Sequence, residues 1–421
     1  MIPFGFFSFG LGQGDWVIVR RNTTSSNAAF VGVVADTSGV STTGYGYTTT
    51  ALGELTNYEL AGTFKSARQV ALASFSTTPW NLARTNAGET YLVGELGGNT
   101  GIWKYDSSNT RAWVKSVTDG GHATDVVVDS SGNAYVASSS SPSRITKWDS
   151  SGNSTWQRIT RFGGNLNGNL HAIALDASGN VYVTGRVEDG SPDLGILWKI
   201  DSSGNLVWVR RLSYLSNTVE FYGIAIGPSG SIYTVGEGTD AGGAIVKWDS
   251  SGNVIWQKEF RGAGGSGSQY GASVALDENE NLYVWGYTRA TTTLGGTLLK
   301  VDSSGNLVLA RHFVWGVPQN QIGEIKVFGD KYYATLTGYN AAGTYSRGVL
   351  VSLPIDGSKS GATGVVGGET FTYSTPAITF GNAAFVLTTP SYSLAASTTT
   401  VSTPTLTDTS NSYNNFIYTI A

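Results

Sequence analysis

Short runs of alternating apolar and polar residues cover most of the chain, and turns rich in Asp, Asn, Ser and Gly separate them. Alternation with a period of two places every second side chain on the same face of an extended strand. Asp and Asn accept hydrogen bonds from turn amides, and Gly adopts the positive φ that tight hairpin turns require. No long segment shows the period of an amphipathic helix, so the pattern predicts an all-β protein.

One sequence recurs five times, for example as KWDSSGNSTWQ from Lys147 and as KWDSSGNVIWQ from Lys247. A Lys lies two residues before each Asp, a bulky apolar residue seven after it and a cation nine after it. The four columns are Asp106, Asp149, Asp201, Asp249 and Asp302; Lys104, Lys147, Lys199, Lys247 and Lys300; Trp113, Trp156, Trp208, Trp256 and Leu309; and Lys115, Arg158, Arg210, Lys258 and Arg311. Matches in four columns indicate a repeated structural unit.

The four Trp residues of this repeat, Trp113, Trp156, Trp208 and Trp256, are expected to pack between neighbouring units, because burying an indole ring stabilises a fold by roughly 2 to 3 kcal/mol. The Lys and Arg columns are expected to lie over these rings or to pair with the turn Asp residues. The alternative is a basic ring that binds polyanions.

A second repeated sequence precedes the first and contains its own turn, as in IALDASGNVYVTG from Ile173. Further copies begin at Val33, Leu82, Val126, Ile224, Val274, Ile325 and Ile378, and the eight turns that they contain are about 43 to 52 residues apart. Together the two sequences describe a unit of four antiparallel strands. A four-stranded repeat of about 50 residues predicts a propeller blade.

The strand order, the D-x-S-G-N-x-Y-V-x-G turn and the K-W-D-S-S-G-N-x-x-W hairpin resemble the NHL-type and bacterial SBBP-type β-propeller repeats over roughly residues 16–421. This resemblance implies a closed ring of blades, because a lone four-stranded sheet cannot bury both of its faces. It implies a fold more directly than an activity.

The two ends of the chain predict the number of blades. The unit that begins at Ile378 has two candidate strands and a last strand NNFIYTIA, but no fourth strand. The N-terminal sequence GDWVIVRR, residues 14–21, matches the fourth strand GNLVWVRR from Gly204. We therefore predict a single eight-bladed propeller of four-stranded antiparallel blades over residues 14–421. Residues 14–21 would complete the C-terminal blade, and residues from about 389 to 414 would form a long loop insert.

Composition excludes several classes of function. The 421 residues carry a formal net charge of −4, which provides no positive field for nucleic acid, so no nucleic-acid partner is expected. With no Cys, the chain has no disulfide, no thiolate nucleophile and no zinc–thiolate site. The acidic turn DENEN, residues 277–281, lacks the Gly and the distal Glu of an EF-hand loop, so neither a metal nor a cofactor is expected.

The first 13 residues, MIPFGFFSFGLGQ, are apolar, but they are too short to span a bilayer and lack the basic start of a signal peptide, so membrane insertion is not expected. We predict an anchoring arm that docks into a partner through Phe4, Phe6, Phe7 and Phe9. The alternative is that the arm folds back under its own ring.

The repeated turns and both chain ends are expected on one side of the ring. The loops that differ between units then lie on the other side, where recognition is common. Five aromatic residues of these loops and of the connections between units are predicted to stack on sugar rings, and two His residues are predicted near the mouth of the central channel: Tyr222, Tyr270, Tyr287, Trp315 and Tyr339; His122 and His171.

An arm on one side, variable loops on the other and a composition rich in Gly, Ser and Thr resemble bacteriophage virion proteins of the appendage or decoration type. This resemblance implies a non-enzymatic structural protein that is assembled in the host cytoplasm and incorporated in the virion. Its arm would contact other virion proteins, and its loops would serve decoration or adhesion to host-surface glycans.

Two alternatives stay open. The hairpin D-S-S-G-N-x-x-W resembles the tryptophan-docking motif of quinoprotein dehydrogenases, with one residue fewer, which implies a channel-mouth enzyme of that type or one that degrades polysaccharides. Glu188, Asp189 and Asp193 share one loop and could pair as acid and base, although ordinary solvation is the simpler interpretation, and no catalytic residue is predicted. The second alternative is a cellular scaffold that resembles the propellers bridging envelope proteins.

Overall fold

The structure is a computed structural model of the chain. It describes residues 16–20, 28–47, 51–60, 64–71, 77–118, 121–161, 168–188, 193–214, 218–239, 242–262, 269–289, 294–315, 317–339, 346–358, 362–366, 369–382, 386–388, 393–396, 401–402, 407–410 and 415–419. Over these ranges, no helix has the length and apolar character needed to cross a membrane. The predicted arm, with Phe4, Phe6, Phe7 and Phe9, lies outside the described residues.

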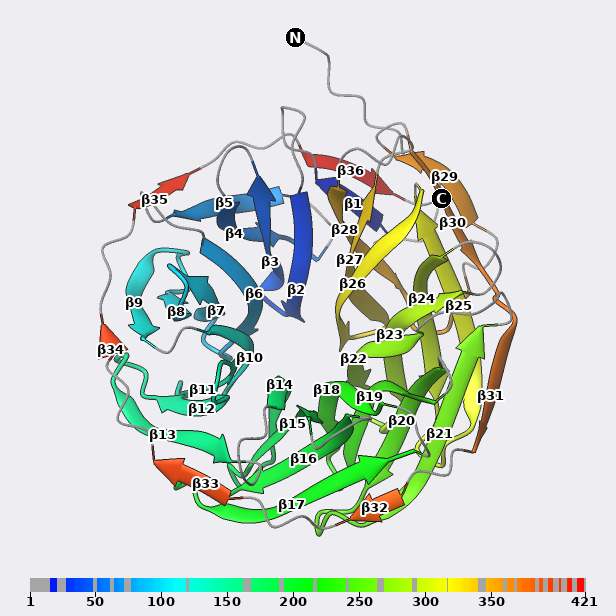
Figure 1. Cartoon of the computed structure of the whole chain (residues 1–421). Coiled ribbons are helices and arrows are strands. Elements are labelled where there is room, and N and C mark those ends of the chain that lie inside the picture. The colour runs from blue at the N-terminus through cyan, green and yellow to red at the C-terminus, as the bar shows by residue number, and fades with distance from the viewer. Residues whose placement is uncertain are drawn as a thin grey trace.

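Seven antiparallel sheets surround a central channel and form the blades of a propeller (Figure 1). Each blade begins at the channel and ends at the rim. Blade 1 contains β2 (Ala28–Asp36), β3 (Gly39–Tyr47), β4 (Ala51–Tyr58) and β5 (Phe64–Ala71); blade 2 contains β6 (Thr77–Arg84), β7 (Thr90–Leu96), β8 (Thr100–Tyr105) and β9 (Arg111–Val117); blade 3 contains β10 (His122–Val128), β11 (Ala134–Ser139), β12 (Arg144–Trp148) and β13 (Ser154–Arg161); blade 4 contains β14 (Gly168–Leu175), β15 (Val181–Val187), β16 (Leu194–Ile200) and β17 (Leu206–Ser213). Blade 5 contains β18 (Glu220–Ile226), β19 (Ile232–Thr239), β20 (Gly242–Trp248) and β21 (Val254–Gly262); blade 6 contains β22 (Tyr270–Leu276), β23 (Leu282–Arg289), β24 (Leu294–Val301) and β25 (Leu307–Trp315); blade 7 contains β26 (Val317–Phe328), β27 (Lys331–Tyr339), β28 (Ser346–Pro354) and β1 (Trp16–Arg20).

The repeated turns have the geometry that their sequence predicts. In the turn after β12, Asp149 Oδ1 accepts hydrogen bonds from the backbone N–H groups of Ser151 and Asn153, at 2.9 and 2.8 Å. Gly152 has a φ of 85°, which a residue with a side chain adopts only at a cost. The Asp cap and the Gly together fix the hairpin register.

The hydrophobic core lies between blades. One cluster joins Tyr135 and Ile145 of blade 3 to Ile173 and Trp198 of blade 4. The second strand of a blade is buried almost throughout, as in β15, because neighbouring blades cover both of its faces. A single blade therefore cannot hold its fold alone.

The prediction of eight blades is wrong. Seven of the eight predicted units form blades, but the sequence from Ile378 does not form a hairpin. β31 (Ile378–Asn382) pairs with β21 of blade 5, whereas β32 (Val386–Thr388) pairs with β17 of blade 4. Alternation identifies both segments as strands, but it does not show whether two successive strands pair with each other or with the edges of different sheets.

The C-terminal segment passes around the outside of the ring, as the orange and red strands of Figure 1 show. After the hairpin of β29 (Ala362–Val366) and β30 (Glu369–Ser374), β30 pairs with β25 of blade 6. The chain then adds one strand each to blades 5, 4, 3, 2, 1 and 7: β31, β32, β33 (Ser393–Ala396), β34 (Val401–Ser402), β35 (Thr407–Ser410) and β36 (Asn415–Thr419). We call residues 369–419 the C-terminal belt. The predicted loop insert at 389–414 thus contains three belt strands.

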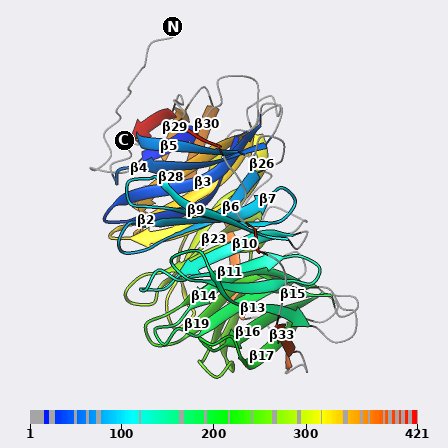
Figure 2. The ribbon, with the colours of Figure 1, turned by 90° about the vertical axis from the view of Figure 1, so that its left-hand side faces the viewer.

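Strand β1 does supply the fourth strand of the closing blade, but that blade is the seventh. Ile18 is opposite Leu350 of β28 on one edge and Ile417 of β36 on the other. β1 is therefore an inner strand, and the belt strand β36 is the outermost one. Trp16 pairs with Ser352 and Thr419, so both described ends of the chain lie toward the edge of blade 7 that carries the repeated turns. Figure 2 shows the ring from the side.

Side chains of the Lys, Trp and Arg columns donate hydrogen bonds to the turn of the next blade. Trp156 of blade 3 donates through Nε1 to Ser202 O of blade 4 at 3.3 Å, and Arg158 Nε donates to Gly204 O at 2.6 Å. We call this contact the interblade latch. It recurs with Lys104 and Trp113 on Ser150 O, Lys199 on Ser250 O, Lys247 and Trp256 on Ser303 O, Arg210 on Gly252 O, and Arg311 on Gly357 O.

A Tyr of the second strand completes each latch. In blade 4, Tyr182 packs edge to face against Trp208 at 6.1 Å between ring centroids, and Lys199 Nζ lies 5.2 Å from the Tyr182 centroid. The Lys ammonium is thus attracted both by an aromatic face and by a carbonyl oxygen. The Lys and Arg columns make contacts between blades. These contacts account for the repetition of the columns, so a polyanion ligand is not needed to explain it.

Adding a methyl group to a latched turn should weaken the ring. A Cβ at Gly252 would lie 2.9 Å from Arg210 Nε and 3.2 Å from the Trp208 ring, whereas a Cβ at Gly230 meets nothing within 4 Å. Both glycines have nearly the same positive φ, 81° and 79°, so Gly230→Ala is a matched control for backbone strain. In urea unfolding, we expect Gly252→Ala to lower the free energy of unfolding by about 1 to 3 kcal/mol more than the control. Equal losses of unfolding free energy in the two variants would show that the latch contributes nothing to stability.

Candidate binding site at the channel mouth

The innermost strands of the seven blades enclose a cavity of about 890 Å³. Its wall is formed by β2, β6, β10, β14, β18, β22 and β26, which Figure 1 shows around the centre of the ring. Each of these strands runs from the side of the variable loops to the side of the repeated turns. The first residues of each strand therefore form the mouth of the channel on the variable side.

A bulge in each inner strand changes which side chains face the channel. The pairing register shifts between Pro79 and Asn81 in blade 2, and at the equivalent position in blades 3, 4 and 5. The bulged residues Trp80, Thr124, His171 and Tyr222 all line the cavity. A bulge inserts one extra residue and re-aims its neighbours, so simple alternation assigns these side chains incorrectly.

Four of the predicted ligand-binding residues form one aromatic row. His171 and Tyr222 have ring centroids 5.2 Å apart, Tyr222 and Tyr270 are also 5.2 Å apart, and Tyr270 stacks on Tyr287 at 5.7 Å. The row crosses blades 4, 5 and 6. We call these four side chains the aromatic row.

The other predicted residues lie apart from the aromatic row. His122 packs against Trp80, with 5.5 Å between ring centroids, and Trp80 is 37% exposed. Trp315 and Tyr339 are the last residues of β25 and β27, but their side chains lie outside the described part.

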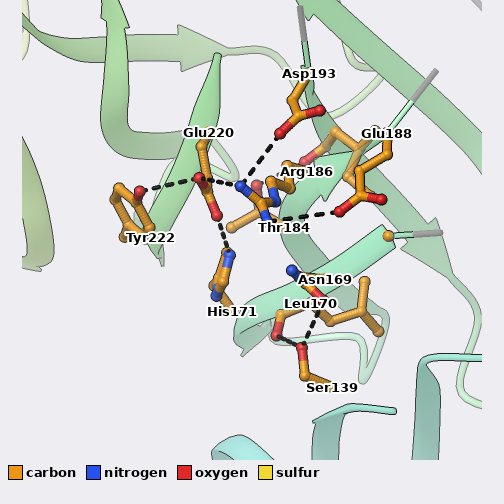
Figure 3. Close-up of polar contacts among 12 residues, drawn as sticks. Ser139, Asn169, Leu170, His171, Thr184, Arg186, Glu188, Asp193, Glu220 and Tyr222 are labelled. Atoms are coloured by element: carbon orange, nitrogen blue, oxygen red, sulfur yellow. Dashed lines mark hydrogen bonds and ion pairs between the residues drawn. The ribbon is translucent and has the colours of Figure 1, made fainter. Parts of the chain in front are cut away.

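Glu220 contacts two members of the aromatic row and also Arg186 of β15 (Figure 3). It accepts a hydrogen bond from Tyr222 Oη at 3.0 Å, contacts His171 Nε2 at 2.6 Å and forms an ion pair with Arg186 at 3.2 Å. Burial alone would raise the pKa of Glu220, but His171, Arg186 and Tyr222 together hold this pKa below its ordinary value. Burial and the Glu220 charge in turn raise the pKa of Tyr222, so the phenol stays protonated.

Arg186 forms ion pairs with two carboxylates of the loop that contains Glu188 and Asp193. Besides Glu220, it pairs with Asp193 at 3.2 Å and with Glu188 at 3.6 Å (Figure 3). Burial raises the pKa of Asp193, Arg186 lowers it, and the charges of Glu188 and Glu220 raise it further, so the net pKa is above the ordinary value. Asp189 is not described. These carboxylates neutralise and orient one guanidinium, which is an arrangement for positioning rather than for an acid–base pair.

A second polar group is built into the wall of the channel. Asn81 Nδ2 donates to Asp125 Oδ1 at 2.7 Å and to Glu324 Oε1 at 2.9 Å. Asp125 Oδ2 accepts from Ile173 N of the next blade at 2.8 Å, and Glu324 Oε2 accepts from Val33 N across the closure of the ring at 3.1 Å. Carboxylates of one blade therefore satisfy backbone N–H groups of the next. We assign Asp125 and Glu324 to holding the blades together.

The turn DENEN serves the same purpose. Asp277 Oδ1 accepts from the N–H groups of Asn279 and Asn281, and Glu280 Oε2 accepts from Tyr233 Oη of the preceding blade at 3.0 Å. In the part of the chain that the structure covers, no group of three or more His, Asp and Glu residues is arranged to hold a metal ion.

The fold is a seven-bladed β-propeller whose channel mouth carries aromatic and acidic side chains. The chain is similar to the WD40 domain of Neurospora crassa Pan2, with a TM-score of 0.52 and 10% identity over 81% of this chain and 96% of that one. It is also similar to BamB from Moraxella catarrhalis, with a TM-score of 0.40 and 14% identity over 82% of this chain and 93% of that one. A Bacteroides caccae protein of unknown function has a TM-score of 0.43 and 14% identity over 70% of this chain and 93% of that one.

At these identities the similarity supports the propeller fold alone. No protein-family model matches the chain. No curated protein matches it by sequence.

The buried carboxyl of Asp125 makes stability depend on pH. Burial and the nearby Glu324 charge raise its pKa from 3.8 to about 7. Between about pH 4 and 7 the folded state thus holds a proton that the unfolded state has lost, so the free energy of unfolding falls as pH rises through this window. In urea unfolding, we expect the protein to be less stable at pH 8 than at pH 5, by on the order of 1 to 3 kcal/mol from this group. Asp125→Asn should reduce that difference, and an unchanged difference would contradict this assignment.

Proposed function

We propose that this propeller is a non-enzymatic recognition protein that binds a carbohydrate at the channel mouth through the aromatic row. The observation that carries the proposal is the contact of four rings from three blades at the rim of a cavity of about 890 Å³. Sugar rings present C–H faces that pack on aromatic faces and hydroxyl groups that need hydrogen-bond partners. The row supplies the aromatic faces, and Glu220 and Arg186 supply polar groups at its edge.

The rings are held in place before any ligand binds. Tyr222 is fixed by its hydrogen bond to Glu220, which His171 and Arg186 hold in turn. A rigid site does not lose conformational entropy when a ligand binds, so preorganisation favours affinity. The ion pairs of Arg186 thus support binding even where they do not touch the ligand.

The setting in a virus particle is part of the same proposal. The apolar arm, the variable loops on the opposite side and the composition rich in Gly, Ser and Thr, which resemble virion appendage or decoration proteins, motivate it. In this setting the N-terminal arm attaches the protein to other virion proteins, while the channel mouth faces away and adheres to host-surface glycans. The described chain ends lie toward the turn side, opposite the mouth, which suits this orientation.

Catalysis by the most perturbed carboxyl group is the weaker alternative. Asp125 has the raised pKa of a general acid, but its oxygens already accept hydrogen bonds from Asn81, Val126 N and Ile173 N. A group that is held in this way is better explained by its structural contacts.

Loss of one ring should weaken carbohydrate binding. We expect Tyr270→Ala to reduce the affinity for a glycan selected on an array by about tenfold, because one aromatic contact contributes roughly 0.5 to 1.5 kcal/mol beyond the area it buries. Tyr270→Phe keeps the ring and is the matched control, with affinity expected near that of the unmodified protein. The readout is titration of the purified protein with that glycan. The absence of any glycan ligand, equal binding by the Ala variant, or cleavage of the glycan would overturn the proposal.

The proposed anchoring makes a separate prediction. Deleting residues 1–13 should abolish incorporation of the protein into the assembled particle while leaving glycan binding unchanged. Sedimentation of particles mixed with the full-length or truncated protein measures this. Normal incorporation of the truncated protein would remove the anchoring role.

A further inference from the structure

The contact between blades 1 and 2 lacks the Tyr, Lys and Trp of the latch; the fourth latch position is Arg68, whose side chain lies outside the described part. At the positions that hold Tyr, Lys and Trp in blades 2 to 5, blade 1 has Ser41, Asn57 and Ser66. Three large side chains that elsewhere reach the next blade are therefore replaced by small polar ones. The turn that they would hold is residues 106–109 of blade 2, which has the same hairpin hydrogen bonds as the latched turns.

The replacement leaves a cavity of about 260 Å³ between blades 1 and 2, on the side of the repeated turns. Its floor is built from small hydrogen-bonded groups. Ser41 Oγ bonds to Asn57 Oδ1, and Ser66 Oγ accepts from Asn57 Nδ2 and from Asn109 Nδ2, both at 3.1 Å. Ser41 is fully buried, whereas Asn57, Ser66 and Asn109 are half-buried, so this polar floor extends from the interior toward the surface. We call this cavity the latch pocket.

Two acceptor atoms in the latch pocket have lost the donors that they have elsewhere. In latched turns, the carbonyl oxygen of the Ser after the Asp accepts from a Lys ammonium or a Trp N–H, as Ser150 O and Ser303 O do. The equivalent oxygen here is that of Ser107, which receives no hydrogen bond from any residue that the structure describes.

The second acceptor is a carboxylate oxygen. In the turns after β12, β16, β20 and β24 an Asn amide donates to Oδ2 of the Asp, as Asn153 does to Asp149 at 2.8 Å. Thr110 stands at that position in blade 2, and Asp106 Oδ2 has no donor among the described residues. The latch pocket thus presents one carboxylate oxygen, which has lost a donor of its own turn, and one carbonyl oxygen, which has lost a donor of the preceding blade, both on exposed residues.

We infer that the latch pocket binds a small arylalkylamine, whose ammonium and ring replace the missing Lys, Tyr and Trp side chains. The ammonium donates to Asp106 Oδ2 and Ser107 O, and the ring fills the volume that aromatic side chains fill between the other blades. Charge-assisted hydrogen bonds of this kind are about twice as strong as neutral ones. The proposal does not depend on the channel mouth.

The two described cations that line the pocket, Lys65 and Arg84, both contact blade 1. Lys65 Nζ donates to Ser38 O at 3.1 Å, and Arg84 pairs with Asp36 at 3.2 Å. Both positive groups are therefore engaged with blade 1, away from the turn of blade 2.

Tryptamine is the probe that tests the inference, because it carries an indole ring and a primary ammonium. Titration calorimetry of the full chain should show saturable binding at millimolar concentration. Indole, which lacks the ammonium, and N-acetyltryptamine, which lacks its charge, should bind at least about tenfold more weakly. Comparable affinity for all three would overturn the proposed role of the acceptor oxygens.

Two variants place the binding in the latch pocket. Asp106→Asn keeps the turn acceptor but puts an amide where the free carboxylate oxygen lies, and it should weaken tryptamine binding at least about tenfold. The same change in a latched turn, Asp149→Asn, is the matched control and should have no effect. Ser66→Trp rebuilds the latch, so it should abolish binding and raise the urea midpoint of the free protein. No binding to the unmodified protein, or equal binding to all variants, would refute the inference.

Discussion

The closed ring depends on one five-residue strand that is hydrogen-bonded along both edges. β1 pairs with β28 on its inner side and with β36 on its outer side, so the closing blade contains both described ends of the chain. Without β1, blade 7 would have only three strands of its own, and its outer edge would be open. Because the core of this protein lies between blades, opening one blade would also expose the apolar faces of its two neighbours.

The C-terminal belt extends the same principle around the whole circumference. The outermost strand of every blade would otherwise present unpaired N–H and C=O groups, and exposed edges promote pairing between molecules. The belt covers each of them with a short strand, in the order opposite to that in which the blades are made. The interblade latches lie on the turn side. Neighbouring blades are therefore held together by the polar contacts beside the channel, by the latches between blades and by the belt at the rim. This division leaves the mouth on the opposite side free to carry the aromatic row.

The sequence predicts the blades because each repeated residue of their turns has a direct geometric role. Asp149 caps its turn, Gly152 takes a positive φ, and Trp156 packs toward the next blade, so each repeated position has a physical reason. The belt strands have no such signal. They pair with the edges of distant blades, and strand pairing between residues such as Gln69 and Thr409 leaves no trace in local alternation. The unit from Ile378 was counted as a blade for this reason.

The site was predictable only in part. His171, Tyr222, Tyr270 and Tyr287 were predicted as ligand-binding aromatic or imidazole groups of the variable side, and the structure brings them into one row. Trp80, Asn81, Asp125 and Glu324 were missed, because bulges in the inner strands turn them toward the channel against the simple period of two. Glu220, which precedes the bulge of β18, was missed as well. Two adjacent polar residues in an otherwise alternating strand, as at Thr124 and Asp125, are the signal that could have revealed such a bulge.

The most direct test of the account is a disulfide cross-link at each edge of β1. The chain contains no Cys, so paired cysteines introduced at Ile18 and Leu350, or at Ile18 and Ile417, would be its only thiols. Opposite residues of antiparallel strands lie close enough for a disulfide. We predict that both pairs close in the folded protein, as does Gln69 with Thr409 for the belt, when peptides are mapped by mass spectrometry. Failure of the Ile18–Leu350 pair to close in the native protein would contradict the seven-bladed ring sealed by β1.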